Sequence, residues 1–266
     1  MKLEFEKYSA HGNDFIVIDN RVHHLLLDEV KLFQKLCKRR TSVGADGVIL
    51  IDTDEPDFRA HFYNSDGNAM LMCGNGARIA VDFARHLGII TTQGTFRVRG
   101  KKHKGRIDGS LIGAELYTES RNITQHIIRY NDREYTGYVC DTGVPHYIII
   151  AEDDTPNPTI ELARKIRYNP EFNPDGVNVS WVQVIDQHTI LIRTYERGVE
   201  DFTLSCGTAA AAVAFIGMQQ AWLDFPVFVR SLGGTLRVDS GDSPDSIWIW
   251  GTVDHIYTGT IADINR

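Results

Sequence analysis

The feature that most constrains this chain is a pair of Cys-Gly dipeptides, each placed between an apolar strand with a polar turn and a helix of small residues. The first dipeptide is Cys73-Gly74 and the second is Cys206-Gly207. Cys206 follows Cys73 at a distance of half the 266-residue chain. This spacing predicts that each half of the chain contributes one equivalent thiol.

A thiol at the start of a helix has a distinctive electrostatic environment. Unpaired backbone N–H groups and the positive end of the helix dipole both stabilise a thiolate. We therefore expect Cys73 and Cys206 to be reactive rather than inert.

Two further matches support an internal repeat. The segment 94–98 (GTFRV) recurs as 234–238 (GTLRV), in each case after the cysteine helix. The segment 11–18 opens the first half much as 142–150 opens the second. Three matches in the same order indicate a repeated unit, and two such units predict a shared cleft.

Hydrophobic periodicity predicts the secondary structure. The helix that follows Cys73 runs to Leu87 with Gly88 as its C-cap, and the helix at 209–223 is similarly apolar around most of its circumference, so both must be enclosed. Asp28 is the expected N-cap of an amphipathic helix at 28–40. A further helix is expected at 160–166. Strands are expected at 3–7, 15–19, 48–51, 58–63, 96–98, 106–108, 114–117, 138–140, 147–151, 179–185, 189–195, 225–230, 235–238 and 247–250.

These elements predict an α+β fold. We expect two pseudo-symmetric domains, each a curved, mainly antiparallel sheet wrapped around a central helix, with the active site in the cleft between them. The predicted domains are residues 1–121 with Cys73 and residues 122–258 with Cys206. We expect the tail, residues 259–266, to pack back on the first domain.

Charge and composition exclude several classes of function. A net charge of −7 argues against nucleic acid or an anionic membrane as partner. The basic run 101–106 is interpreted as a solvated hairpin tip. Residues 1–6 lack the apolar core of a signal peptide, and the apolar run 209–218 is too short to span a bilayer. We therefore expect a soluble cytoplasmic protein.

The chain has four cysteines but no CxxC pair and no Cys/His cluster at ligand spacing. This pattern argues against a zinc site or a disulfide framework, and a reducing compartment suits thiols that must stay free. Cys37 and Cys140 fall on apolar-facing positions and are expected in the core.

Two acid/base groups of the same kind suggest a reaction with mirror-related ends. A proton leaves one face of a carbon and another proton arrives at the opposite face. One thiol must be ionised to remove the proton while the other is protonated to deliver it.

Seven motifs, in this order, carry a resemblance to a known family. They are GNDF at 12–15, GADG at 44–47, NSDG at 64–67, MCGNGAR at 72–78, VN at 177–178, ERG at 196–198 and CGT at 206–208. Over nearly its full length the chain resembles the pyridoxal-phosphate-independent diaminopimelate epimerases. The resemblance implies interconversion of LL- and meso-2,6-diaminopimelate, a step toward lysine and peptidoglycan, without a metal or an organic cofactor.

The resemblance also implies roles for individual residues. Cys73 and Cys206 are the two bases. Donors to the carboxylate at the reacting carbon are the backbone N–H groups of Gly74, Asn75, Gly207 and Thr208, with the Thr208 hydroxyl. The far end of the substrate is held by Asn13, Asn64, Asn178, Glu196 and Arg197, where Glu196 suits the ammonium and Arg197 the carboxylate.

Some features depart from the family or leave alternatives open. Val144 stands where the family usually has Asn, the segment from Glu196 to Cys206 is one residue longer than usual, and Ala209 replaces a frequent glycine. His146 is open between a cleft residue and a structural one. A racemase of another amino acid, a non-catalytic amino-acid-binding protein and a thiol redox protein remain as alternatives. A homodimer is carried as a hypothesis, since no motif fixes the oligomeric state.

Overall fold

The computed structural model describes residues 2–70, 72–117, 123–152, 155, 157–172 and 174–262. It divides into two compact units, Met1–Glu115 with Trp250–Arg266 and Leu116–Ile249. The chain passes from one unit to the other within β7 (Leu111–Tyr117) and returns within β16 (Ser246–Gly251). The boundary expected between residues 121 and 122 lies outside the described residues, so the domain limits drawn from the sequence stay a prediction.

The first unit begins with two strands that are followed by two short helices. Its remaining elements are β1 (Leu3–Ala10), β2 (Asn13–Asp19), α1 (Asn20–His23), α2 (Val30–Cys37), β3 (Gly47–Thr53), β4 (Phe58–Asn64), α3 (Gly74–His86), β5 (Gln93–Val98), β6 (Lys101–Asp108) and, from the end of the chain, β17 (Asp254–Ile261). β17 pairs with β1 in antiparallel sense, with Leu3 opposite Ile261. The last strand thereby closes onto the first.

Strand β2 is buried on both faces. Phe15 and Val17 belong to the core that holds the side chains of α3. Ile16 and Ile18 belong to a second core with Phe33 of α2. Since successive side chains of a strand point to opposite faces, a strand covered on both sides reads as a continuous apolar run.

The second unit has its own set of elements. They are β8 (Thr124–Tyr130), β9 (Arg133–Asp141), β10 (Pro145–Ile150), α4 (Ile160–Arg167), a 3₁₀ turn η1 (Pro170–Phe172), β11 (Asn178–Asp186), β12 (Thr189–Glu196), β13 (Asp201–Thr203), α5 (Gly207–Gln219), β14 (Val227–Ser231) and β15 (Gly234–Ser240).

Strand pairing reveals the repeat directly. From β1 to β6 the successive pairs are antiparallel, parallel, antiparallel, parallel and antiparallel. The same alternation runs through β9, β10, β11, β12, β14 and β15. The turns that open the two series carry equivalent glycines, Gly12 and Gly143, with φ of 83° and 89°. Left-handed backbone at both turns favours glycine, which has no Cβ to clash there.

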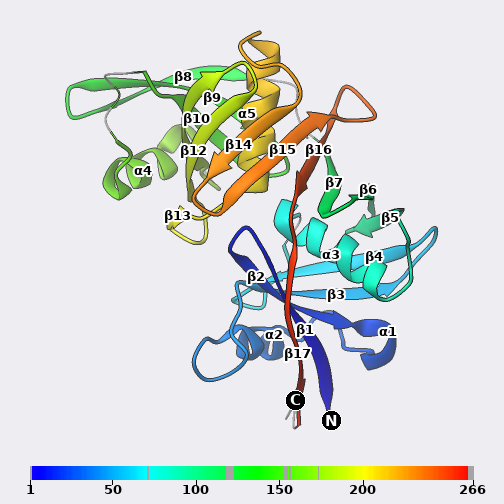
Figure 1. Cartoon of the computed structure of the whole chain (residues 1–266). Coiled ribbons are helices and arrows are strands. Elements are labelled where there is room, and N and C mark those ends of the chain that lie inside the picture. The colour runs from blue at the N-terminus through cyan, green and yellow to red at the C-terminus, as the bar shows by residue number, and fades with distance from the viewer. Residues whose placement is uncertain are drawn as a thin grey trace. The chain divides into compact units, whose positions relative to one another are not determined.

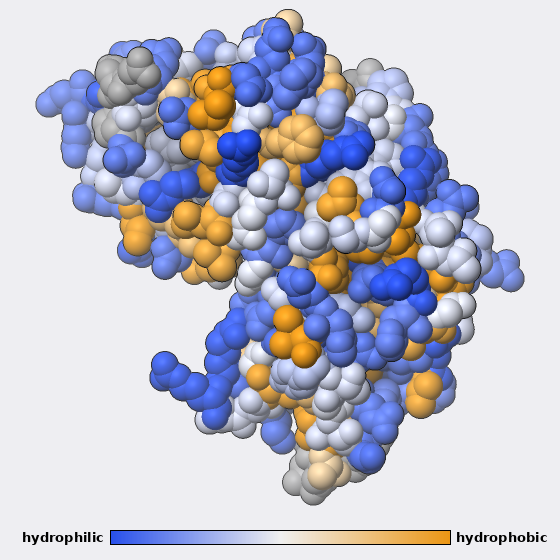
Figure 2. Space-filling view, viewed as in Figure 1, coloured by the Kyte–Doolittle hydropathy of each residue, from blue (hydrophilic) through white to orange (hydrophobic). Residues whose placement is uncertain are grey.

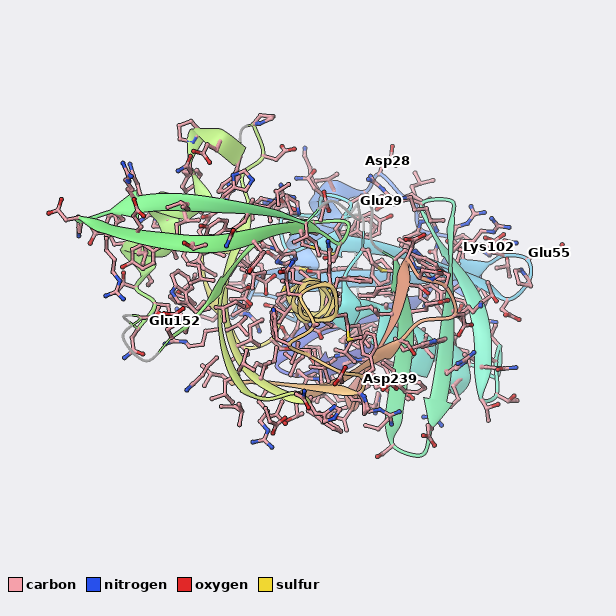
Figure 3. The ribbon with its side chains drawn as sticks, turned by 90° about the horizontal axis from the view of Figure 1, so that it is seen from above. Asp28, Glu29, Glu55, Lys102, Glu152 and Asp239 are labelled. Atoms are coloured by element: carbon pink, nitrogen blue, oxygen red, sulfur yellow. The ribbon has the colours of Figure 1, made fainter. Side chains whose placement is uncertain are left out.

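The two central helices occupy equivalent positions in the repeat (Figure 1). Helix α3 contacts β1, β2, β3, β4 and β6, and helix α5 contacts β9, β10, β11 and β15. Figure 3 looks down α5, with strands curving around it. Nearly every residue in the first turns of both helices is buried. The expected α+β fold and the two enclosed helices are confirmed.

One of the matches taken from the sequence is wrong. Segment 94–98 lies in β5, whereas segment 234–238 lies in β15. By the order of pairing, β5 corresponds to β14 and β6 to β15. Five similar residues in a short strand therefore misplace the repeat by one strand.

The predicted limits of the helix at 28–40 are also wrong. The helix is Val30–Cys37, and its N-cap is Glu29, whose side chain does not cap the helix by a hydrogen bond. Lys38 turns to an extended conformation and Arg40 has φ of 72°, which ends the helix early. Gly88, with φ of 70°, follows the C-cap Leu87 of α3 instead of being the cap itself.

The basic run 101–106 is not a hairpin tip. It lies within β6, and the turn of the hairpin is Arg99-Gly100. The Lys102 side chain lies on the outside of its unit (Figure 3), whereas His103 is buried. Alternation along the strand explains both, since neighbouring side chains point to opposite faces.

Polar side chains cover most of the face seen in Figure 2, with smaller groups of hydrophobic residues between them. None of the helices in the described residues combines the length and the apolar character that crossing a bilayer requires.

Candidate active site

Cys73 is the N-cap of α3, in extended backbone with φ of −134° and ψ of 120°. Its Sγ accepts a hydrogen bond from the Gly76 N–H at 3.4 Å. An N–H aimed at the sulfur stabilises the anionic form more than the neutral form. Gly76 also permits close packing, because a Cβ there would lie 3.0 Å from the Phe62 ring.

Two of the predicted binding residues meet Cys73. The Cys73 thiol donates to Asn13 Oδ1 at 3.6 Å, and Asn75 Nδ2 donates to the same oxygen at 3.4 Å. Asn13 Nδ2 in turn donates to Asp46 Oδ2 at 2.9 Å. The turn between β1 and β2 therefore brings Asn13 to the start of α3, although the two lie sixty residues apart in sequence.

Asn64 is placed differently. It is the last residue of β4 and is exposed, and its backbone bonds to the turn that follows, with its N–H donating to Asn68 O at 2.9 Å. Within the described residues no hydrogen bond joins its side chain to Cys73. Its predicted contact with substrate stays a prediction.

Cys206 is the N-cap of α5 and is 9% exposed. Its Sγ lies 3.3 Å from the Thr208 hydroxyl. Thr208 is itself held, because the Thr142 hydroxyl donates to its carbonyl oxygen at 3.0 Å. Thr142, at the turn between β9 and β10, was not singled out from the sequence; its place in the repeat, equivalent to the turn that carries Asn13, is the signal that could have found it.

Three more predicted residues gather at the ends of β11 and β12. Asn178 is buried, and its Oδ1 accepts from the Arg197 backbone N–H at 2.7 Å. The Arg197 guanidinium donates to Asp175 O at 3.4 Å. Glu196 Oε1 accepts from the Thr203 hydroxyl. Arg197 makes no ion pair with Glu196 in the described part of the chain, and the predicted substrate contacts of both residues stay predictions.

His146 lies on β10 beside Asn178 of β11 and is fully buried. Neither ring nitrogen has a hydrogen-bond partner among the described residues. Burial, with the nearby Arg197 charge, lowers the pKa of His146 to about 3. The imidazole is therefore neutral throughout the physiological pH range.

The other two cysteines differ from the helix-start pair. Cys37 and Cys140 are 3% and 1% exposed. Burial raises the pKa of each thiol to about 12. Their predicted place in the core is confirmed, and they are neutral, inert thiols near neutral pH.

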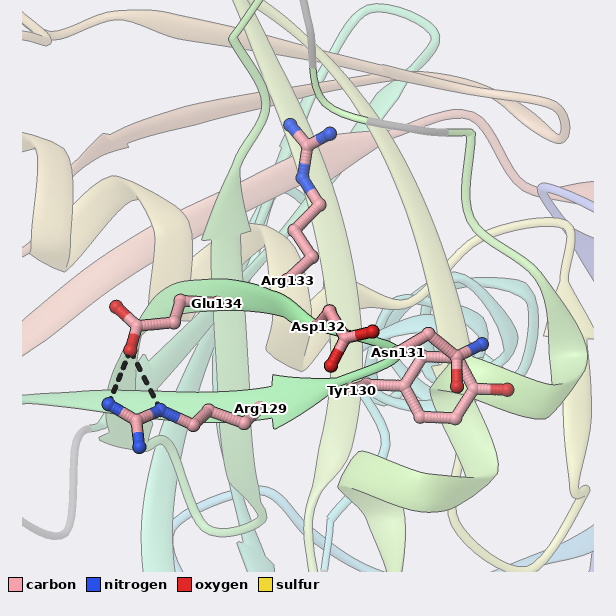
Figure 4. A pocket seen from close by; sticks show the side chains of 6 residues that line it. All are labelled: Arg129, Tyr130, Asn131, Asp132, Arg133 and Glu134. Carbon is pink, nitrogen blue, oxygen red and sulfur yellow. Dashed lines mark hydrogen bonds and ion pairs between the residues drawn. The ribbon is translucent and has the colours of Figure 1, made fainter.

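The predicted site residues do not belong to a metal cluster or to the hollow at the β8–β9 hairpin in the described part of the chain. No group of three or more His, Cys, Asp or Glu suited to a metal ion occurs among the described residues. A hollow of about 240 Å³ lies at the tip of the β8–β9 hairpin, lined by residues 129–134 (Figure 4). Arg129 and Glu134 pair across it, and none of the predicted site residues lines it.

Comparison with known proteins identifies the family. The family model described as diaminopimelate epimerase matches residues 5–108 and 138–252, which contain Cys73 and Cys206. The diaminopimelate epimerase of Aquifex aeolicus is 35% identical over 283 residues, covering 98% of both chains. That of Flavobacterium psychrophilum is 40% identical over 267 residues, covering 97% of this chain and 100% of the relative.

Solved structures of low sequence identity share the fold. A hydroxyproline epimerase from Agrobacterium vitis gives a TM-score of 0.72 at 13% identity, covering 98% of this chain and 92% of that one. A phenazine biosynthesis PhzF-family protein from Enterococcus faecalis gives 0.71 at 11% identity, covering 98% and 99%. With two cysteine-capped central helices in a repeated fold, and with relatives that match over almost its whole length, this chain belongs to the diaminopimelate epimerase family of isomerases.

Proposed function

We propose that the protein interconverts LL- and meso-2,6-diaminopimelate by a two-base mechanism in which Cys73 and Cys206 are the acid and base. The observation that carries the proposal is the equivalence of the two thiols. Each caps a buried helix at the same place in a repeated order of strands. A reaction whose two directions are mirror images at one carbon needs two such groups.

In the forward direction the thiolate of one cysteine removes the proton from the substrate Cα, and the electron pair is delocalised into the adjacent carboxylate. The thiol of the other cysteine then donates its proton to the opposite face of the carbon. The first cysteine ends as a thiol and the second as a thiolate. The reverse reaction exchanges the two roles.

Charge that develops on the carboxylate must be stabilised. Donors for it are the N–H groups at the starts of α3 and α5, from Gly74, Asn75, Gly207 and Thr208, together with the Thr208 hydroxyl. A backbone donor aimed at charge that appears in the transition state contributes about 3 kcal/mol, and the Thr208 hydroxyl contributes about 1 kcal/mol, roughly one ordinary hydrogen bond. Helix N-termini are well suited to this because their N–H groups are unpaired and point outward.

The far end of the substrate carries a second ammonium and a second carboxylate. We assign Glu196 to the ammonium and Arg197 to the carboxylate, with Asn13, Asn64 and Asn178 as further contacts. Asn178 supports this assignment by holding the Arg197 backbone, and Thr203 supports it by holding the Glu196 carboxylate. Such preorganised side chains lose less entropy when they bind.

A second candidate is epimerisation of another amino acid. It is favoured by one observation, the apolar Val144 at a turn where a polar residue is usual in the family. That turn also carries Thr142, whose N–H donates to Val144 O at 3.3 Å.

The location and the oligomeric state are part of the proposal. Free thiols suit a reducing compartment, so we place the protein in the cytoplasm. We keep a homodimer as a hypothesis.

The test is incubation with LL-diaminopimelate in deuterated water, followed by chiral separation and mass spectrometry. We expect meso-diaminopimelate with deuterium at one Cα. Proline and hydroxyproline, run in parallel, distinguish the second candidate. No deuterium at any Cα of these amino acids would overturn the epimerase mechanism.

A further inference from the structure

Arg78 of α3 is a buried charge that pairs with no carboxylate of the described residues. It is 0% exposed, and no described carboxylate lies within ion-pairing distance of it. Its Nε has no hydrogen-bond partner among the described residues. Burial lowers its pKa to about 10, so it still carries its charge at neutral pH. A buried cation without an anion is costly, and removing this cost calls for a negative charge nearby.

The guanidinium is turned toward the start of its own helix. Nη1 donates to Gly74 O at 3.2 Å, and Nη2 donates to Asn75 Oδ1 at 2.7 Å. The start of a helix is the positive end of its dipole, which repels a cation. Stabilisation of the helix therefore does not explain an arginine at this place. The residue next to Gly74 is Cys73.

A chain of hydrogen bonds joins Arg78 to Cys73. Arg78 donates to the oxygen of the Asn75 amide, which fixes the orientation of that amide. Asn75 Nδ2 then donates to Asn13 Oδ1, the oxygen that also accepts from the Cys73 thiol, so the Asn75 amide competes with the thiol proton for this acceptor. An acceptor beside the sulfur by itself favours the neutral thiol, and the positive charge of Arg78 acts in the opposite sense. The Cys73 charge also acts on Arg78, raising its pKa against the effect of burial. By reciprocity, Arg78 favours the Cys73 thiolate.

The other charged and titratable groups around this end of α3 are already engaged. Arg78 Nη2 also donates to His11 Nδ1 at 3.2 Å, which assigns the neutral imidazole its proton on Nε2. Asp82, one turn along, pairs with Arg85 at 2.7 Å. Asp46, which binds Asn13, belongs with Asp14 to a cluster that is neutralised by Arg39 and Lys7.

The second unit has an alanine at the position equivalent to Arg78. Counting from the cysteine, Arg78 is the fifth residue after Cys73, and the fifth residue after Cys206 is Ala211. Ala211 is 0% exposed and lies among the alanines of α5. A buried position at this point of the repeat can therefore hold an alanine, and the fold by itself does not require an arginine there.

We propose that Arg78 is a positioning residue that favours the anionic form of Cys73 and orients the Asn75 amide beside it. The inference rests on the proposed role of Cys73 as a base. It makes the two equivalent thiols unequal at rest, with Cys73 as the ionised one.

The test measures the ionisation of Cys73 without using turnover. Wild type, Arg78→Met, Arg78→Lys and Arg85→Met are alkylated with iodoacetamide from pH 5 to pH 10, and the labelling rate of each cysteine is read by peptide mass spectrometry. Arg78→Met is expected to slow labelling of Cys73 at pH 7 about fivefold and to move its pH profile up by about one unit. Arg78→Lys is expected to restore part of the shift.

Two internal controls accompany the variants. Arg85→Met removes one positive charge from the same helix but is expected to leave the Cys73 profile unchanged, since Arg85 is paired with Asp82 and partly exposed. Labelling of Cys206 is expected to be the same in all four proteins. An unchanged Cys73 profile in folded Arg78→Met, or an equal shift at both cysteines, would overturn the proposal.

Wild type alone can still contradict the proposal should Arg78→Met not fold. Cys73 is expected to titrate below the ordinary cysteine value of about 8.5, and a value at or above it would contradict the proposal. Deuterium exchange into diaminopimelate is a separate assay. A protein can therefore fail this test and remain an epimerase, or pass it and have another substrate.

Discussion

The two cysteine-capped helices share a backbone plan but differ in what surrounds the sulfur. At the start of α3, Cys73 meets a backbone N–H and an amide that is tied to a buried arginine. At the start of α5, Cys206 is more deeply buried and meets the Thr208 hydroxyl, and alanines fill the helix behind it. The repeat preserved the thiol and its helix while the neighbouring side chains diverged.

This difference suits a reaction that needs one thiolate and one thiol at the same moment. Two thiols in identical surroundings would share the proton equally, and only a fraction of molecules would be ready for either direction. Unequal surroundings favour one arrangement. If both thiols act, removal of either one abolishes turnover, whereas changes to the surrounding side chains have smaller effects.

The largest expected effect comes from removing either thiol. Cys73→Ser and Cys206→Ser are each expected to lower kcat by at least about a thousandfold, because an alcohol is too weak an acid to supply the anion at neutral pH. Steady-state kinetics with LL-diaminopimelate measures this. Cys37→Ala is the matched control, since it removes a thiol from the core and should leave kcat near the wild-type value. A serine variant that keeps a tenth of the rate would remove that cysteine from the mechanism.

The second prediction concerns recognition, which we place mainly in the second unit. Arg197→Lys is expected to raise KM about thirtyfold with a smaller change in kcat, because an ammonium does not reproduce the two-point contact of a guanidinium. Arg193→Lys, an exposed neighbour on β12 that lies over the Phe202 ring, is the control and should leave KM unchanged. Equal KM values for both variants would assign Arg197 to the surface.

The third prediction probes the hydroxyl beside Cys206. Thr208→Val keeps the shape of the side chain but removes the oxygen 3.3 Å from Sγ. We expect kcat/KM to fall about tenfold, the contribution of roughly one hydrogen bond. Thr208→Ser should retain most of the activity because it retains the hydroxyl. If valine and serine behave alike, the contact has no part in the reaction.

The smallest expected effect is on the pH dependence of stability. It comes from His146, which is buried in its neutral form, whereas Arg78 is buried as a cation. The folded pKa of His146 is about 3, below the ordinary value of 6.5, so the unfolded chain binds a proton more readily. Stability is therefore lost as pH falls from about 6.5 toward 3, at about 1 kcal/mol per pH unit. Chemical denaturation at pH 7 and pH 5 should show a smaller loss in His146→Gln than in wild type.

The control for this effect is His24→Asn, because His24 is exposed and Asn tolerates its left-handed backbone. Its loss of stability between pH 7 and pH 5 should match that of wild type. A wild-type loss no greater than that of His146→Gln would show that His146 is not held neutral by burial.

Much of this arrangement was predictable from the sequence, and the failures have physical causes. The cysteine helices were found because a helix that is apolar all round must be enclosed, whatever surrounds it. The residue type of Asp28 predicts a helix cap, yet the N-cap is Glu29, one residue later, and no side-chain hydrogen bond caps the helix there. The basic run of β6 shows no apolar alternation, because its buried face carries only His103 and Gly105. The hydrophobic pattern therefore does not predict a strand there.

Arg78 and β17 were missed for a related reason. A lone arginine in a helix is ordinarily a surface residue, and only the packing of α3 inside its sheet shows that this one is buried. β17 has an exposed pattern along nearly its whole length, so no alternation marks it, and its existence depends on pairing with β1 at the other end of the chain. Long-range pairing of this kind leaves little trace in local sequence.

The most direct test of the two-base account is the position of deuterium at early times. LL-diaminopimelate is incubated with the protein in deuterated water, the reaction is stopped before a tenth of the substrate has turned over, and both isomers are separated. The account predicts that newly formed meso-diaminopimelate carries solvent deuterium at the inverted carbon, since its hydrogen comes from the second thiol, while the remaining LL isomer keeps its original hydrogen. Early meso product that retains the substrate hydrogen would mean that a single base serves both faces, and would contradict the account.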